Sequence, residues 1–158
     1  MGVEIERKFL VNERKWASME KTNGQFVQQG YLLTDPDKTI RIRVTDGRGY
    51  LTIKGLTTGA TRKEFEYEIP NEEATELLNT FSVSGLTKIR YTISHRNTVW
   101  QVDEFKADNT GLIIAEVELQ NESQNFDKPD WIEEEVTQEE KYYNSNLSLH
   151  PFKHWKKN

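Results

Sequence analysis

Six segments of this chain carry charged residues at every second position, in one case with a threonine in the series, and this pattern constrains the fold most. The groups are Glu4/Glu6/Lys8, Arg41/Arg43, Thr52/Lys54, Glu64/Glu66/Glu68, Lys88/Arg90 and Glu116/Glu118. Successive side chains of a β-strand point to opposite faces of a sheet. The pattern therefore predicts strands with one ionic face, while the aliphatic and aromatic residues between the charges form the other face.

The rest of the sequence arranges these strands in an antiparallel, mainly β architecture. About eight strands are expected, over residues 3–11, 26–33, 39–45, 50–55, 61–69, 87–94, 98–105 and 112–119. Most are joined by short turn signals such as Asp46-Gly47, which favour hairpins over parallel crossovers. A helix over residues 13–21, capped by Asn12, and a second helix capped by Asn71 interrupt the strands. Residues 120–158 are expected to be partly helical around 139–149.

A sheet of this kind can bury its apolar face in two ways. In a sandwich the apolar faces meet and the charges face water, whereas in a closed barrel the charges line a lumen and helices cover the apolar outside. Outside the first strand, like charges recur with no neutralising partner along the strand, which suits a bound ligand or metal. Arginine is also common among the cations, and it suits bidentate contacts to phosphate. We therefore predict an α+β, mainly β fold, a closed eight-stranded antiparallel barrel with helices packed outside, as a single domain over residues 1–158.

Composition and charge exclude several classes of function. The chain has 158 residues, a formal net charge of −5 and no Cys. The acidic balance argues against general nucleic-acid binding, and the lack of thiols excludes thiol catalysis and thiolate metal ligands. No apolar run approaches transmembrane length and no signal peptide opens the chain, so a cytoplasmic location is expected. The three His lack ligand spacing, so any metal would have oxygen ligands, which favours Mg²⁺ or Mn²⁺.

A lumen that holds both sets of charges selects a class of ligand. Its cations would attract a compact and highly charged anion. Carboxylates in the same lumen would repel that anion unless a divalent cation lies between them, and Mg²⁺ is commonly held by one or two carboxylates plus substrate phosphates. A polyphosphate with metal ions therefore uses both sets, and the metal could activate water and stabilise the leaving phosphate. The alternative, a solvated ionic surface, requires no ligand.

The ordered series of charged segments resembles the CYTH superfamily, the triphosphate tunnel metalloenzymes. Glu4-Ile5-Glu6-Arg7-Lys8 is similar to the ExExK signature of that family. The resemblance continues through Arg41-Ile42-Arg43, Thr52-Ile53-Lys54, Arg62-Lys63-Glu64-Phe65-Glu66, Lys88-Ile89-Arg90-Tyr91, Val102-Asp103, Glu116-Val117-Glu118, Glu134-Glu135-Val136-Thr137 and Tyr142-Tyr143-Asn144. It implies an eight-stranded antiparallel tunnel with charged walls that acts on triphosphates.

The same resemblance implies roles for individual residues. The metal ions, Mg²⁺ or Mn²⁺, would be held by Glu4, Glu6, Asp103, Glu116 and Glu118. The phosphates would be held by Lys8, Arg41, Arg43, Lys54, Arg62, Lys88 and Arg90. Tyr31 resembles a tyrosine proposed as proton acceptor, and the further catalytic candidates are Lys8 and Lys88; a lone Tyr needs a neighbouring Lys to act as a base, and a core aromatic is the alternative for Tyr31. Glu64 and Glu66 are expected to support the site by orienting the arginines.

Several functions remain open for such a site. The leading expectation is metal-dependent hydrolysis of inorganic triphosphate to pyrophosphate and phosphate, because the chain is short and lacks extra modules. The alternatives are a class IV-type adenylate cyclase, a thiamine triphosphatase and a non-catalytic polyphosphate-binding module. The expected partner is a small anionic triphosphate, with neither nucleic acid nor membrane. Aromatic residues near the C-terminus are compatible with a homodimer.

Overall fold

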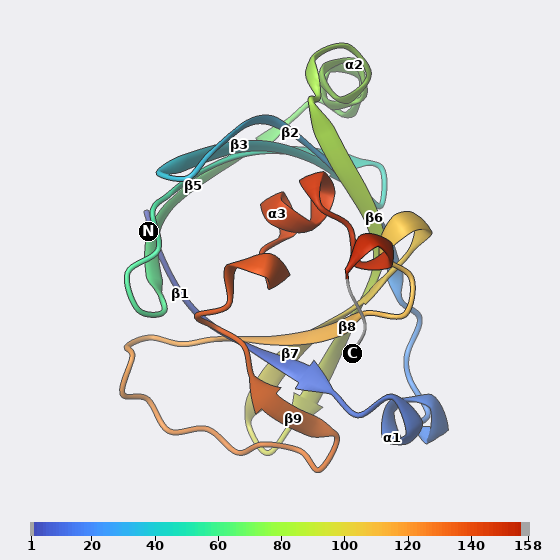
Figure 1. Ribbon diagram of the computed structural model, residues 1–158, viewed down its shortest axis with the longest axis vertical. Coiled ribbons are helices and arrows are strands. Elements are labelled where there is room, and N and C mark those ends of the chain that lie inside the picture. The colour runs from blue at the N-terminus through green and yellow to red at the C-terminus, as the bar shows by residue number, and fades with distance from the viewer. Residues whose placement is uncertain (1, 156–158) are drawn as a thin grey trace.

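The strands form one continuous sheet that closes on itself, as the computed structural model describes for residues 2–155 (Figure 1). The strands are β1 Val3–Val11, β2 Gln25–Asp35, β3 Lys38–Thr45, β4 Arg48–Gly55, β5 Thr61–Ile69, β6 Ser84–His95, β7 Thr98–Phe105, β8 Ile113–Glu118 and β9 Ile132–Glu135. Their order is β5-β4-β3-β2-β6-β7-β8-β1-β9. An additional pairing of β5 with β1 closes the first eight strands of the chain into a barrel, and β9 extends the sheet beyond β1. The predicted closed eight-stranded antiparallel barrel is confirmed.

Two-residue turns set the register of the hairpins. Asp46 and Gly47, with φ of 52° and 72°, join β3 to β4, and Arg96 and Asn97, with φ of 47° and 67°, join β6 to β7. Consecutive positive φ values give the turn a twist that matches the twist of the two strands, and Gly, Asn and Asp tolerate this backbone best. The sequence signal at Asp46-Gly47 is therefore confirmed as a tight turn.

The seam that closes the barrel is short. β1 pairs with β5 over Val3↔Lys63, Glu4↔Arg62 and Ile5↔Thr61, and then leaves β5 to pair with β8. Beside the seam, the Glu122 carboxylate accepts hydrogen bonds from the Ala60 backbone N–H at 3.2 Å and from the Thr61 hydroxyl at 2.8 Å. The register of this seam places the acid of β1 next to a cation of β5.

The helices α1 Glu13–Ser18 and α2 Asn71–Phe81 lie outside the barrel, as expected (Figure 1). Asn12 caps α1, because its Oδ1 accepts from the Lys15 backbone N–H at 2.9 Å, although the helix ends before the predicted residue 21. The predicted cap at Asn71 was wrong. Pro70 occupies the cap position in an extended conformation with no side-chain cap, so Asn71 is already helical. The buried Ala74 methyl of α2 lies so close to Gly49 of β4 that any Cβ at Gly49 would collide with it.

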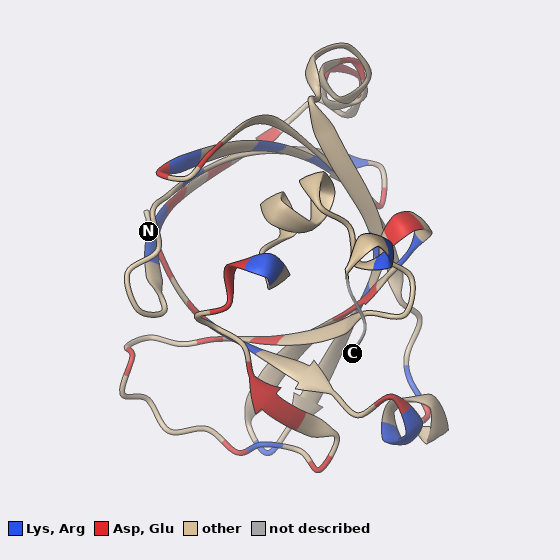
Figure 2. Cartoon of the chain, viewed as in Figure 1, with Lys and Arg blue, Asp and Glu red and all other residues tan. Residues whose placement is uncertain are grey.

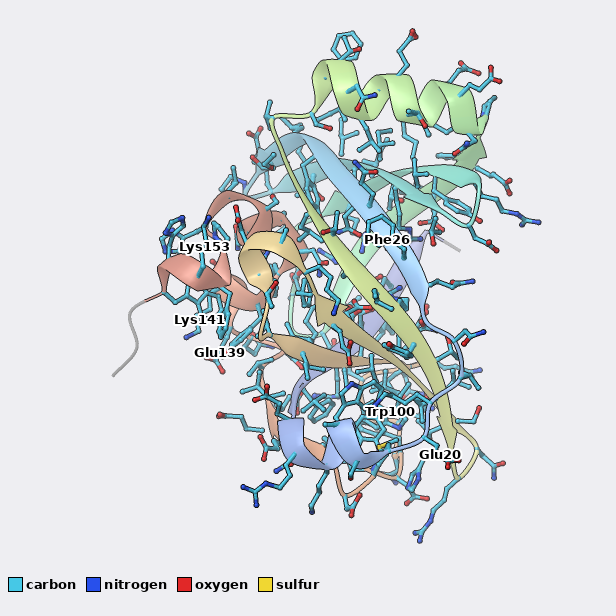
Figure 3. The ribbon with its side chains drawn as sticks, turned by 90° about the vertical axis from the view of Figure 1, so that its right-hand side faces the viewer. Glu20, Phe26, Trp100, Glu139, Lys141 and Lys153 are labelled. Atoms are coloured by element: carbon cyan, nitrogen blue, oxygen red, sulfur yellow. The ribbon has the colours of Figure 1, made fainter. Side chains whose placement is uncertain are left out.

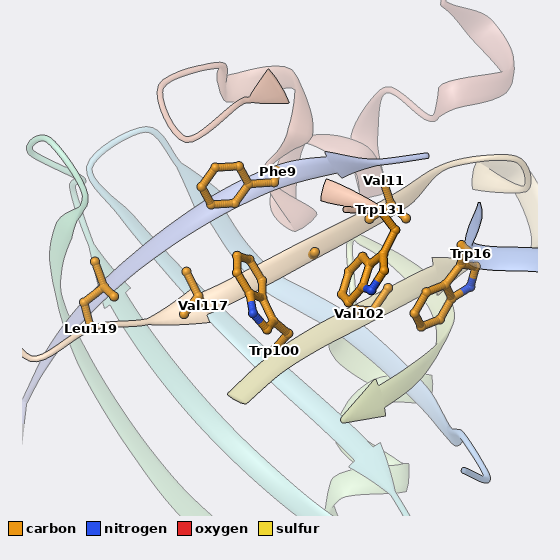
Figure 4. Packing of buried hydrophobic residues seen from close by; sticks show 9 residues of the cluster. Phe9, Val11, Trp16, Trp100, Val102, Val117, Leu119 and Trp131 are labelled. Atoms are coloured by element: carbon orange, nitrogen blue, oxygen red, sulfur yellow. The ribbon is translucent and has the colours of Figure 1, made fainter. Parts of the chain in front are cut away.

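The main apolar core lies outside the barrel wall formed by β1, β7 and β8 (Figure 4). Phe9, Trp16, Trp100 and Trp131 pack here with aliphatic residues, and the Trp16–Trp131 and Trp100–Trp131 ring centroids are 5.5 and 6.1 Å apart. β9 pairs with β1 and helps to cover this core. Sequence analysis missed β9, because its one apolar residue is followed by three glutamates without alternation.

Two tryptophans of this core should differ in their tolerance of phenylalanine. The Trp16 Nε1–H donates to Glu104 Oε1 at 2.6 Å, whereas the buried Trp100 Nε1–H has no partner among the described residues. A hydrogen bond to a charged group contributes about 1.5–3 kcal/mol, and removal of an unsatisfied donor costs no hydrogen bond. We expect Trp16→Phe to lower the free energy of unfolding by roughly 1–2 kcal/mol more than Trp100→Phe does, as measured by urea unfolding. An equal or larger loss for Trp100→Phe would contradict this expectation.

The C-terminal segment lies across one end of the barrel instead of on its outside (Figures 1 and 3). It comprises η2 Glu140–Tyr142, α3 Asn144–Leu149 and η3 Phe152–His154, and α3 packs on β6 and β2. At this end of the barrel the side chains that point inward are apolar, and they pack against the C-terminal segment. The buried residues of this cluster are Leu86, Phe105, Leu112, Ile114, Val136, Tyr142 and Leu147. The expectation of helices packed outside therefore holds for α1 and α2, whereas α3 covers the apolar rim of the lumen.

Among the described residues, no helix combines the length and the apolar character needed to cross a membrane. The cytoplasmic location and the homodimer stay predictions.

Candidate functional site

The inward faces of the strands enclose a polar cavity of about 440 Å³. Charged residues recur around the ring of strands (Figure 2). The predicted site residues that line the cavity are Glu4, Glu6, Lys8, Tyr31, Arg41, Arg43, Lys54, Arg62, Glu64, Glu66, Lys88, Arg90, Glu116 and Glu118. The charges therefore face a lumen, and the alternative of a sandwich with a solvated ionic face was wrong.

Two glutamates and a lysine form the centre of the acidic wall. The register pairs Lys8 of β1 with Glu116 of β8, and Lys8 Nζ lies 2.7 Å from Glu116 Oε2 and 3.2 Å from Glu6 Oε1. Burial raises the pKa of Glu6 to about 8, and the negative charge of Glu116 adds to this effect. Burial acts on Glu116 in the same direction, but the Lys8 ammonium, the hydrogen bond with Glu6 and the positive charges of Arg90 and Lys88 together hold the pKa of Glu116 well below its ordinary range. Glu6 thus retains a proton that Glu116 has lost.

The third acid of the wall, Glu4, lies at the barrel seam. Its Oε1 accepts from Arg62 Nε at 2.8 Å, and its Oε2 lies 3.4 Å from Lys54 Nζ. Burial opposes ionisation, but the positive charges of Lys54 and Arg62 hold the pKa of Glu4 below its ordinary range. Glu64 lies 3.2 Å from the same Lys54 ammonium, and its expected role of orienting the arginines stays a prediction.

The donor set fits a hard divalent cation in chemistry, although it is not preassembled. The four wall glutamates, Glu4, Glu6, Glu116 and Glu118, offer carboxylate oxygens, which Mg²⁺ and Mn²⁺ prefer. Within the part of the chain that the structure describes, no three acidic or His side chains lie close enough together to hold a metal. Lysine and arginine side chains contact Glu4, Glu6 and Glu116 instead, so a metal would take over carboxylates that are now paired with cations.

Asp103 of β7 contacts two cations of the site and is not among the residues that line the cavity. Its side chain is 1% exposed, and its two oxygens accept from Arg90 Nε at 2.7 Å and Arg90 Nη2 at 2.9 Å. Its Oδ2 also lies 2.8 Å from Lys88 Nζ. Asp103 therefore holds both Arg90 and Lys88 in place, and its expected role as a metal ligand stays a prediction.

The opposite wall presents two arginines with free donors. Glu66 Oε2 accepts from Arg41 Nη2 at 3.4 Å and from Arg43 Nη2 at 3.0 Å, and its expected supporting role stays a prediction. The Nε–H groups of both arginines are buried and have no partner among the described residues. Burial, together with the positive charge of Arg41, lowers the pKa of Arg43 to about 10. Buried, unpaired cationic donors are costly unless an anion satisfies them, so this wall is suited to phosphate.

Sequence analysis missed several polar residues of the cavity. Tyr143, Asn144 and Ser145 line it from the C-terminal segment. Asn144 Oδ1 accepts from Lys88 Nζ at 2.9 Å and from Gln29 Nε2 at 3.2 Å, although these residues lie far apart in sequence. An isolated uncharged amide carries no periodic signal, so only its place in the resembling Tyr142-Tyr143-Asn144 motif could have indicated it.

Tyr31 is a buried residue of the cavity wall. Its hydroxyl accepts from Gln29 Nε2 at 3.1 Å, and no hydrogen bond to a lysine is present among the described residues. The role of Tyr31 as a proton acceptor stays a prediction.

Comparisons of the sequence and of the structure with known proteins point to the same family. A sequence model of the CYTH domain matches residues 2–150. An inorganic triphosphatase from Acetivibrio thermocellus is 46% identical over 157 residues, which cover 99% of each chain. An inorganic triphosphatase from Nitrosomonas europaea is 31% identical over 150 residues, covering 92% of this chain and 97% of that one. A crystal structure of an inorganic triphosphatase superposes with a TM-score of 0.64 at 29% identity, covering 92% of this chain and 94% of that chain.

Proposed function

The chain belongs to the CYTH family, and from this premise we propose that it hydrolyses inorganic triphosphate to pyrophosphate and phosphate with the aid of Mg²⁺ or Mn²⁺. The observation that carries the proposal is the unpaired, buried Nε–H of Arg41 and of Arg43 in a cavity whose facing wall carries Glu4, Glu6 and Glu116. A ligand that combines phosphate with metal ions would supply acceptors to these arginines and would use the carboxylates of the facing wall. The two inorganic triphosphatases that align over 92% or more of this chain support the choice of substrate.

The cationic and the acidic residues of the cavity have different roles in the proposed reaction. Arg41 and Arg43, with Lys54, Lys88 and Arg90, bind the phosphate oxygens and neutralise the charge that gathers on the leaving pyrophosphate. The bound metal would supply an activated water and further neutralisation, and Glu4, Glu6, Glu116 and Glu118 would hold it. Overall, the water oxygen bonds to the terminal phosphorus and gives up one proton to the solvent, the bridging P–O bond breaks, and pyrophosphate leaves with that bridging oxygen.

A panel of substrates tests this proposal. Purified protein is incubated with inorganic triphosphate, thiamine triphosphate, ATP and pyrophosphate, each with Mg²⁺, with Mn²⁺ or with a chelator, and phosphate release is measured. We expect the highest kcat/KM for inorganic triphosphate and no release with the chelator. An Arg41→Ala variant should lose at least about a hundredfold in kcat/KM, since single preorganised charges contribute about 10² to 10³.

Other outcomes of the panel identify the alternatives. Formation of cyclic AMP from ATP as the fastest reaction would replace the proposal with a cyclase, and the highest kcat/KM for thiamine triphosphate would replace it with a thiamine triphosphatase. Tight, metal-dependent binding of triphosphate with no hydrolysis would identify a binding module.

A further inference from the structure

The helix that closes one end of the barrel brings a polar group to the phosphate-binding wall. Asn144, the first residue of α3, accepts hydrogen bonds at Oδ1 from Lys88 Nζ (2.9 Å) and from Gln29 Nε2 (3.2 Å). An ammonium group can only donate, so the contact with Lys88 fixes which end of the amide is oxygen. The Asn144 carbonyl thus lies at a defined position beside a cation of the site.

The ammonium of Lys88 is held from two directions. Its side chain is 2% exposed, and Nζ contacts Asp103 Oδ2 of β7 at 2.8 Å as well as Asn144 Oδ1 of α3 at 2.9 Å. An ammonium group has three N–H donors. Two of them are accounted for by Asp103 and Asn144, and Lys88 lines the cavity, so the third is available to a phosphate oxygen.

The support of Asn144 is rigid. Leu147 of α3 is fully buried in the apolar end of the barrel, and the Ser148 hydroxyl lies 2.8 Å from the Ser84 hydroxyl of β6. Gln29 is 1% exposed and its Nε2 also donates to the Tyr31 hydroxyl, so the second partner of Asn144 is itself fixed.

We propose that Asn144 is a positioning residue of this site, which orients the Lys88 ammonium so that its remaining N–H points at the substrate phosphate. The helix that covers the end of the barrel therefore takes part in phosphate binding as well as in packing. The inference rests on the proposed function. A long, flexible lysine side chain is held in one orientation only by such contacts, and residues that orient a functional group in this way typically contribute 10- to 100-fold to affinity or activity.

A double-mutant cycle tests the proposal with wild type, Asn144→Ala, Lys88→Met and the double variant. For each protein we measure kcat/KM for inorganic triphosphate, the Kd for triphosphate by calorimetry, and the melting temperature. We expect Asn144→Ala to lower kcat/KM about 10- to 100-fold in the wild-type background and less than about twofold in the Lys88→Met background. A purely structural role of Asn144 would give the same loss in both backgrounds, and that result would overturn the proposal.

Asn146→Ala is the matched control. Asn146 lies in the same helix, and its Nδ2 donates to the Glu140 backbone carbonyl at 2.7 Å, outside the cavity. We expect its kcat/KM to stay within about twofold of wild type. A loss as large as that of Asn144→Ala would show that the variants act through the helix as a whole, and would also overturn the proposal. If wild type binds triphosphate without hydrolysing it, the proposed function fails, whereas the cycle of Kd values still decides the role of Asn144.

Discussion

Replacing Glu116 with glutamine should lower kcat/KM for inorganic triphosphate by at least about a thousandfold, since a single preorganised electrostatic group contributes about 10² to 10³ and Glu116 serves more than one partner. Its two oxygens contact Arg90 Nη2 at 2.8 Å and Lys8 Nζ at 2.7 Å. A neutral amide would weaken the hold on both cations and would remove a proposed metal ligand. The variant would therefore be weakened in both phosphate binding and metal binding.

The measurement is a steady-state rate of phosphate release over a range of metal concentrations. Glu68→Gln is the control, because Glu68 is an exposed glutamate of β5 that is not among the residues lining the cavity, and it should keep wild-type activity. Saturating metal should restore only part of the loss in Glu116→Gln. Activity within tenfold of wild type in this variant would contradict the assignment of Glu116 to the site.

Glu6 should make the metal-free protein less stable as the pH rises. Burial raises its pKa from 4.5 to about 8, and the charge of Glu116 contributes to the rise. A carboxyl whose pKa is raised on folding binds its proton more tightly in the folded state. Its contribution to stability is therefore complete below pH 4.5 and is lost, at about 1.4 kcal/mol per pH unit, as the pH rises to about 8.

Glu6→Gln isolates this effect, because glutamine resembles the protonated acid and does not titrate. We expect the free energy of unfolding of Glu6→Gln, relative to wild type, to increase by several kcal/mol between pH 5 and pH 8 in the presence of a chelator. Denaturant unfolding of both proteins across this range provides the measurement. Added Mg²⁺ should reduce the difference in free energy of unfolding between Glu6→Gln and wild type at pH 8, because the metal stabilises ionised Glu6 only in wild type. If the free energies of unfolding of the two proteins changed with pH in the same way, the pKa of Glu6 would not be raised on folding.

The alternating charges predicted the barrel because their period is a property of the strand itself. A strand that places Arg41 and Arg43 on one face necessarily places Ile42 on the other, and a closed barrel was predicted because six segments carry their charges on one face in this way. The lining of the cavity therefore follows largely from local pattern, whereas the pairing of β1 with β5 at the seam does not. The cap of α2 did not follow from such a pattern, because the extended Pro70 and the helical Asn71 differ by a single residue position.

The C-terminal part of the site could not be predicted in the same way. Asn144 reaches Lys88 across 56 residues of sequence, and it does so because α3 packs against the apolar rim of the lumen. Asp103 depends on neighbouring strands in the same way. The resemblance implied that it is a metal ligand, and this role stays a prediction, whereas its contacts with Arg90 and Lys88 follow from the pairing of β6 with β7. Such roles depend on which side chains meet across strands, and that is a property of the assembled barrel.

The cover that α3 and its apolar neighbours form over one end of the barrel has a consequence for turnover. Pyrophosphate and phosphate are charged, and to leave at that end they would have to pass through buried apolar packing. We therefore expect both products to leave where polar and charged residues line the cavity.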